Sequence, residues 1–181
     1  MSKVIFCREG VIAGFYRTLA NLNKELAIDI AAYGASPNAL LYPKFYLANK
    51  HSSVYAKETV EVFLFYDRQN TMFNQISAED WKEIGINLDG ISDRIKVEHI
   101  EHIDSIEDWF FDDCQGLSKF FGMNIKPPGT SGREYIKACC YNTGRPYVNA
   151  NESEGKSLVA ALNIPKIAQI RGHELSSLLN P

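Results

Sequence analysis

Short apolar runs alternate with longer stretches of helical periodicity through the first hundred residues. Runs near residues 4–7, 26–33, 58–66 and 94–100 predict four β-strands, and apolar residues between positions 12 and 26 recur at the spacing of a helix. The third run is apolar at nearly every position, which is typical of an inner strand in a parallel sheet covered on both faces. The pattern therefore predicts an α/β, Rossmann-like fold with a mostly parallel four-stranded sheet flanked by helices.

Capping signals predict where helices begin after these strands. Ser36 and Pro37 have the character of an N-cap and a first helical residue. The segments 77–80 and 105–108 each place a serine three residues ahead of an aspartate, close to the capping-box pattern. We expect a helix to start at each of these three places.

A Lys-Pro-Pro-Gly breaker at 126–129 separates the α/β unit from the rest of the chain. We expect an α/β domain over residues 1–125 and a small, mainly helical, basic C-terminal extension over residues 126–181 that packs on the same domain. Within the extension, the sequence predicts a helix at 132–140, then a polar loop, and an apolar-periodic stretch at 163–179.

The composition limits the class of protein. The chain has 181 residues, of which 45% are hydrophobic, and this is enough for one sizeable core. Its four cysteines form no Cys-x-x-Cys pair, so neither a disulfide framework nor a zinc site is indicated. No run reaches the ~18 apolar residues of a membrane span, and Arg8 and Glu9 interrupt the first apolar run too early for a signal peptide. We expect a soluble cytoplasmic protein with no membrane partner.

The net charge of −3 conceals an asymmetry along the chain. Residues 1–113 carry a net charge of −7, whereas residues 114–181 carry +4. A basic tail beside an acidic site could face the phosphates of a nucleic acid. The alternative is an ordinary solvated surface, since scattered Lys and Arg usually serve solubility.

Acidic side chains from three separate segments are the strongest functional signal. Glu9 and Asp67 follow the first and third apolar runs, and the segment 107–113 carries four more carboxylates. Parallel α/β sheets bind their ligands outside the carboxyl ends of the strands. Carboxylate oxygens from several segments are also what a hard divalent cation requires. We therefore expect these segments to converge on one metal site.

Phosphodiester hydrolysis is the reaction that such a site would support, because metal ions can activate water and neutralise the phosphate. Glu9 and Asp67 are the preferred metal contacts, while Glu107 and Asp112 are second choices. The predicted catalytic residues are Glu9, Asp67 and Glu107. The predicted nucleic-acid contacts are Arg8, Arg68, Lys126, Arg133, Lys137 and Arg145.

Each candidate also has a structural interpretation. Glu9 could begin a helix, where the dipole favours a carboxylate, and Asp67 could form a turn. Asp108 fits a helix cap better than a ligand, because it lies three residues after a serine. His99 and His102 straddle the predicted end of the fourth strand, where a surface role is the simpler expectation.

The same residues carry a resemblance to a known family. A Glu-Gly pair after the first strand, an aromatic-rich helix, an Asp closing a later apolar strand and the Ile-Glu-Asp-Trp-Phe-Phe-Asp-Asp segment at 106–113 resemble the Toprim domains of OLD-like and RloB-like bacterial defence families. The likeness covers residues 3–125. It implies a Toprim-type nuclease that depends on Mg²⁺ or Mn²⁺, cleaves DNA or RNA, including transfer RNA, and serves as the toxin of an antiviral defence system beside an ABC-type ATPase partner. Homo-oligomerisation is a further possibility.

The sequence departs from this family at one important position. Where the resemblance predicts Asp-x-Asp, the chain has Asp67, Arg68 and Gln69, so that a neutral amide replaces a charged ligand. Either Glu107 or Asp112 supplies the missing charge, or the chain is a non-catalytic module that docks the ATPase through the acidic face formed by residues 79–113. A flavodoxin-like nucleotide-binding domain is a third interpretation, although no Gly-rich phosphate loop follows the first strand.

Overall fold

The fold is described from a computed structural model. The structure describes residues 2–8, 10–33, 46, 59–67, 95–102, 105–129, 131–148 and 151–180. The helix starts predicted near Ser36 and Ser77 lie outside these residues, as do Glu9 and Arg68. Within the described residues, no helix is long and apolar enough to cross a membrane.

The described strands form one parallel sheet in the order β2-β1-β3-β4. These strands are β1 (Ser2–Arg8), β2 (Ile28–Tyr33), β3 (Val60–Asp67) and β4 (Ile95–His102). The α/β class and the parallel sheet are therefore confirmed. The strand β4 continues two residues beyond its predicted end, so that His102 belongs to the strand.

The strand order reverses direction between β1 and β3. After β1 the chain adds β2 on one side, and then returns to place β3 on the other side of β1, followed by β4. In open parallel sheets, a reversal of this kind creates a crevice outside the carboxyl ends of the two central strands, where ligands bind. The carboxyl ends of β1 and β3 are therefore the place to look for a site.

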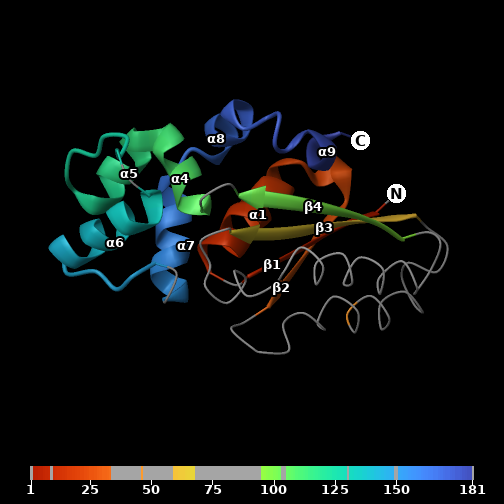
Figure 1. Cartoon of the computed structure of the whole chain (residues 1–181), viewed down its shortest axis with the longest axis horizontal. Coiled ribbons are helices and arrows are strands. Elements are labelled where there is room, and N and C mark those ends of the chain that lie inside the picture. The colour runs from red at the N-terminus through yellow and green to blue at the C-terminus, as the bar shows by residue number, and fades with distance from the viewer. Residues whose placement is uncertain are drawn as a thin grey trace.

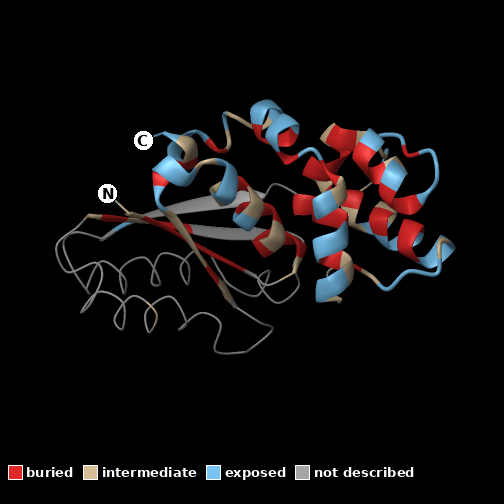
Figure 2. Ribbon diagram, turned by 180° about the vertical axis from the view of Figure 1, so that it is seen from behind, coloured by how far each residue is buried: buried red, intermediate tan, exposed pale blue. Residues whose placement is uncertain are grey.

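Helix α1 (Val11–Leu22) joins β1 to β2 and covers one face of the sheet (Figure 1). A short 3₁₀ turn, η1 (Lys24–Leu26), completes the connection. Gly10 precedes the helix with a φ of 107°, a left-handed value that glycine adopts without strain. Buried residues line the inward faces of α1 and of the later helices (Figure 2).

The C-terminal half is helical; its first helices lie beyond the carboxyl ends of the strands, whereas its last helix lies beside the start of β1. In Figure 1 the arrowheads of β3 and β4 point toward α4 and its neighbours. The elements are α4 (Ile106–Phe110), η4 (Phe111–Asp113), α5 (Cys114–Phe121), α6 (Gly132–Asn142), α7 (Glu152–Ala161), α8 (Ile164–Ile170) and α9 (Ser176–Leu179). The predicted helices after Ser105 and at 132–140 are confirmed, whereas α7 lies in a segment predicted to be partly loop.

One hydrophobic core joins the sheet and these helices. Buried members come from β1, α1, α4, α6 and α9. Phe15 of α1 sits 6.0 Å from the ring of Trp109 and 6.3 Å from the ring of Phe110, so that α4 packs directly on α1. Burial of aromatic side chains of this size is among the larger stabilising contributions in a core. The C-terminal helices are thus an integral part of the fold.

The end of the described chain is attached to the first strand through Lys3. This lysine is only 2% exposed, and its ammonium group donates to the carbonyl oxygens of Ser177, at 3.1 Å, and Leu178, at 2.9 Å. A further bond reaches the carbonyl of Asn180. Carbonyl groups at the end of a helix lack intrahelical donors and carry partial negative charge, so a buried ammonium group satisfies them. Lys3 therefore fixes α9 to the sheet.

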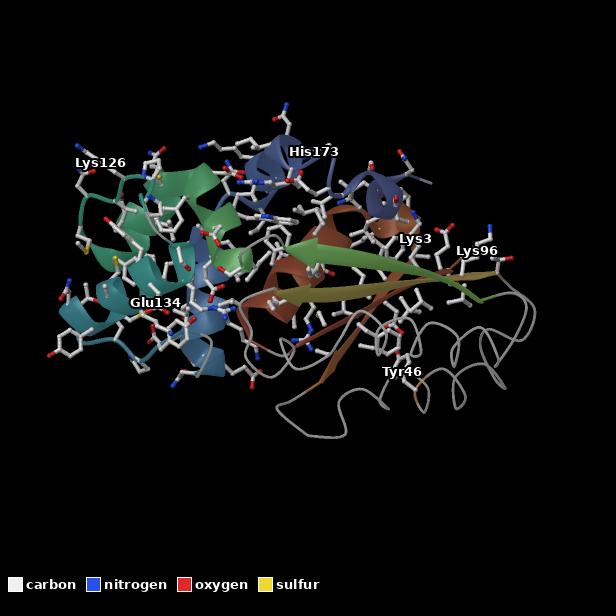
Figure 3. All side chains as sticks on the ribbon, in the orientation of Figure 1. Lys3, Tyr46, Lys96, Lys126, Glu134 and His173 are labelled. Carbon is white, nitrogen blue, oxygen red and sulfur yellow. The ribbon has the colours of Figure 1, made fainter. Side chains whose placement is uncertain are left out.

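We expect Lys3→Met to free α9 while leaving the rest of the fold intact. The substitution keeps the apolar stem but removes hydrogen bonds from a charged donor, each worth about 1.5–3 kcal/mol. Hydrogen exchange should accelerate at the amides of Leu179 and Asn180, which bond to Leu175 and Ser176. Lys96→Met is the matched control, because Lys96 lies exposed on the same sheet (Figure 3). Unchanged exchange at these two amides in Lys3→Met would show that other contacts hold α9.

Candidate functional site

The carboxyl edge of the sheet brings together the ends of the strands that the sequence singled out. Arg8 ends β1 and Asp67 ends β3, and these two strands are neighbours in the sheet. Glu9 lies outside the described residues but follows Arg8 directly in the sequence. Asp67 is paired in register with His102, the last residue of β4. The ends of β3 and β4 therefore carry an aspartate and a histidine at neighbouring positions.

The first turn of α1 also begins at this edge, but it is packed rather than open. Val11, the first residue of α1, is fully buried, and α1 packs against α7. A doubly wound nucleotide site needs the first helical turn to be open to a phosphate. This packing gives no support to the flavodoxin-like nucleotide-binding interpretation.

Glu107 occupies the first turn of α4, immediately beyond the end of β4 in the chain. Its side chain is 0% exposed and accepts a hydrogen bond of 2.7 Å from the hydroxyl of Tyr147. The Nε atom of Arg133 lies 3.7 Å from the same carboxylate oxygen, and the arginine side chain is 14% exposed. A buried charge is tolerated when opposite charge and hydrogen bonds compensate its lost hydration. Glu107 therefore joins α4 to α6 and to the loop after it.

Asp108 caps a helix, although not the helix on which it lies. Its Oδ1 atom accepts a hydrogen bond of 2.6 Å from the backbone nitrogen of Gly132, at the start of α6. Its Oδ2 atom accepts one of 2.9 Å from the hydroxyl of Ser105. A carboxylate at a helix N-terminus satisfies an unpaired amide and interacts favourably with the helix dipole.

Asp112 and Asp113 attach α8 and the turn after it to the same segment. Asp112 accepts two hydrogen bonds from the guanidinium group of Arg171, at 2.6 and 3.1 Å, and that group also lies 5.8 Å from the ring of Trp109. Asp113 accepts a bond of 2.8 Å from the backbone nitrogen of Asn163, at the start of α8. Bidentate pairs of arginine and carboxylate are among the strong hydrogen-bonded contacts in proteins. A metal ion at Asp112 would have to displace Arg171.

The carboxylates of residues 107–113 thus share one role in the described structure. Each of them holds a helix or loop of the C-terminal half, and α4 with η4 is the hub of that arrangement. Among the described residues, no three metal-ligating side chains form a group that could hold an ion. The part of the predicted acidic face that lies in this hub is occupied by internal contacts, which reduces what it could offer to a partner ATPase.

The predicted basic surface is also largely engaged within the molecule. Arg133 pairs with Glu107, Lys137 with Glu134 at 2.7 Å, and Arg145 with Glu154 at 3.1 Å. Lys126 is exposed and has no ion pair within the described residues. From residue 105 onward the chain has eight Lys or Arg and eight Asp or Glu, so the folded C-terminal half is electrically balanced. Three of the predicted nucleic-acid contacts thus also form ion pairs within the molecule.

The cysteines offer no reactive thiolate at this site. All four are free, and Cys7, Cys139 and Cys140 are buried. Burial raises the pKa of the Cys139 and Cys140 thiols, which keeps them protonated near neutral pH. They behave as small apolar residues of the core.

Comparisons with protein-family models, with curated proteins and with solved structures found no match to this chain.

Tyr147 and Arg171 are the site residues that the sequence did not reveal. Tyr147 lies 40 residues from Glu107 in the chain, and Arg171 lies 59 residues from Asp112. Neither has a local pattern that would mark it as a partner of a carboxylate. The available signal was indirect: four carboxylates within seven residues of an apolar segment require compensating donors from elsewhere in the fold.

Proposed function

We propose that the protein is a metal-dependent phosphodiester hydrolase acting on nucleic acid, with its site at the carboxyl ends of β1 and β3. The observation that carries this proposal is the strand order, because β1 and β3 are adjacent, parallel and flank the reversal of the sheet. Asp67 ends one of these strands, and Glu9 follows the last residue of the other. Carboxylates at such a reversal are suitably placed to act on one ligand.

Glu9 and Asp67 are the residues that would hold Mg²⁺ or Mn²⁺ in this proposal. A bound divalent cation supplies an activated water and neutralises charge on the phosphate. Arg8 and Arg68 are the direct sequence neighbours of the two carboxylates and would brace the phosphate. Glu107 and Asp112 would act indirectly, by fixing the helices that face this edge of the sheet.

The resemblance to Toprim domains supports the same reaction and adds its biological setting. It favours a cytoplasmic effector of an antiviral defence system, with DNA or RNA as the substrate and an ABC-type ATPase as the partner. Both substrates remain part of the proposal, since phosphate contacts position a nucleic acid without specifying its sequence.

The decisive experiment is a cleavage assay with end-labelled single-stranded DNA, duplex DNA and transfer RNA, in Mg²⁺ or Mn²⁺. Wild-type protein should cleave at least one substrate, and Glu9→Gln and Asp67→Asn should each reduce the rate to background. Glu25→Gln is the control, because Glu25 is an exposed acidic residue in η1, which precedes the amino end of β2. Circular dichroism should show that all variants retain the wild-type fold. A cleaving wild type that is matched by both variants would overturn the proposed site.

A further inference from the structure

One aromatic side chain of the C-terminal half faces the solvent almost entirely. Tyr141, in the last turn of α6, is 87% exposed, whereas the other described aromatic side chains of this half are buried or half-buried. Lys137 lies one turn earlier on α6, and side chains four residues apart are neighbours on the surface of a helix. The ring of Tyr141 is therefore open to a ligand and has a cation beside it.

A guanidinium group is held against the same end of α6. Gly144 has a φ of 67°, a left-handed value that lets the chain turn back after the helix. The backbone nitrogen of Arg145 then donates to the carbonyl oxygen of Cys140 at 2.9 Å. The guanidinium carbon of Arg145 lies 4.6 Å from the centre of the Phe120 ring in α5, and the side chain is 38% exposed. Packing on Phe120 thus holds this cation while part of it stays in water.

Burial separates the two signs of charge in this half of the molecule. The four carboxylates of residues 107–113 face internal partners, and Glu107 and Asp113 are at most 5% exposed. The segment 114–148 has five Lys or Arg and one Glu. Its exposed basic residues are Lys119, Lys126, Lys137 and Arg145. The surface formed by α5 and α6 is therefore more basic than the balanced total for this half.

The ion pairs on this surface do not prevent it from binding an anion. Lys137 pairs with Glu134, and Arg145 pairs with Glu154, but each of these pairs is accessible to water. Exposed ion pairs contribute little to stability, so a phosphate group can replace the carboxylate. Arg133 differs, because its partner Glu107 is fully buried. Lys137 and Arg145 are therefore available to a ligand, and Arg133 is not.

We infer that the end of α5 and α6 binds single-stranded nucleic acid, with an unpaired base stacked on Tyr141 and phosphates contacting Lys137 and Arg145. Proteins that bind single strands combine cations along the backbone with aromatic rings on which bases stack. In a duplex the bases already stack on one another. Figure 1 shows α5 and α6 at the end of the molecule opposite α9. The inference rests on the proposed function for the reaction that this binding serves, and it adds a substrate class, strands with unpaired bases.

Fluorescence anisotropy of the full chain with labelled oligothymidylate, oligouridylate and a DNA duplex tests the inference. The buffer would contain EDTA, so that binding is measured without cleavage. The wild type should bind at least one of the single strands more tightly than the duplex. Tyr141→Ala should weaken this binding by at least about fivefold, the effect of losing one stacked base, whereas Tyr141→Phe should bind as the wild type does. Ile170→Ala is the matched control, because Ile170 is an exposed apolar residue of α8.

The salt dependence of binding tests the phosphate contacts separately. Lys137→Gln should reduce the slope of log affinity against log salt concentration by about 0.7, the value for one phosphate contact on a single strand. Lys166→Gln should leave the slope unchanged, because Lys166 is an exposed lysine of α8. An unchanged slope in Lys137→Gln would contradict a phosphate contact at this residue.

The outcomes distinguish this inference from the proposed function. Tyr141 is too exposed for its replacement to unfold the protein, and circular dichroism would verify this. If Tyr141→Ala binds single strands as the wild type does, or if the wild type binds the duplex equally well, the inference is overturned, while cleavage by the wild type would still support the proposed function. If binding depends on Tyr141 but no nucleic acid is cleaved in Mg²⁺ or Mn²⁺, the inference holds and the proposed function fails. A wild type that neither binds nor cleaves nucleic acid overturns both.

Discussion

Replacing Glu107 by glutamine should destabilise the protein by about 3 kcal/mol, a large effect for a change of one atom type. The side chain is 0% exposed, and Arg133 lies 3.7 Å away with only 14% exposure. Removing one partner from a buried ion pair leaves the other charge poorly compensated, which costs about 3–5 kcal/mol. The lower value is expected here because Arg133 retains some access to water. Urea unfolding followed by circular dichroism would measure the change.

Glu134→Gln provides the matched control for this prediction. Glu134 forms an ion pair of 2.7 Å with Lys137, but both side chains are well exposed, at 63% and 45%. Exposed pairs contribute only about 0–1 kcal/mol, so this variant should unfold close to the wild-type midpoint. If Glu107→Gln were equally mild, the carboxylate of Glu107 would not be compensating the charge of Arg133.

A double-mutant cycle separates the hydrogen bond of Tyr147 from the charge of Glu107. Tyr147→Phe removes the hydroxyl that donates to the carboxylate at 2.7 Å. In the wild type this should cost about 1.5–3 kcal/mol, as for other hydrogen bonds to charged groups. In the Glu107→Gln background the cost should be smaller, because the acceptor is then neutral. Additive effects would show that the two residues are not coupled.

The sheet could be predicted from the sequence because its signal is local. Short strands that are apolar at nearly every residue, followed by a segment of helical periodicity, are typical of the α/β class with a parallel sheet. The end of β4 was harder to predict, since Glu101 and His102 are polar and lie past the predicted end of the strand. Their membership of the strand depends on pairing with β3, which the sequence of β4 alone does not encode.

The helix α7 was predicted in part as loop for a related reason. Leu158 and Val159 are the only large apolar residues in this helix, so its hydrophobic periodicity is weak. A capping signal was nevertheless present, because the side chain of Asn151 accepts a hydrogen bond from the backbone nitrogen of Glu154. An asparagine three residues ahead of a glutamate predicts a helix start, even in a polar segment such as this one.

The acidic segment shows what a sequence can and cannot reveal about a site. Four carboxylates at 107–113 mark the segment as important, yet a carboxylate that binds metal and one that caps a helix have the same local sequence. Their partners here, such as Tyr147 and Arg171, come from 40 to 59 residues away. The proposed site therefore rests on the sheet topology, which places the carboxyl ends of β1 and β3 beside each other.

Gly116→Ala should destabilise the protein by about 2–4 kcal/mol, although alanine is the better helix former. A Cβ atom at this position in α5 would lie 2.3 Å from Oδ2 of Asp113 and 2.8 Å from the backbone oxygen of Ala161. That same Oδ2 accepts the bond from the nitrogen of Asn163, so moving it would break the hydrogen bond that holds the start of α8. Overpacking costs about 1–3 kcal/mol and the loss of a hydrogen bond to a charged acceptor adds to it, whereas the helix gain is only about 1 kcal/mol.

The opposite case is Gly129, where a Cβ atom would meet nothing within 4 Å. Gly129→Ala should therefore unfold within about 0.5 kcal/mol of the wild type, as surface substitutions usually do. Thermal and urea unfolding of the two variants would measure the difference. If Gly116→Ala were as stable as Gly129→Ala, Gly116 would not be in close contact with Asp113 and with the end of α7. The attachment of α8 to the acidic hub would then need another explanation.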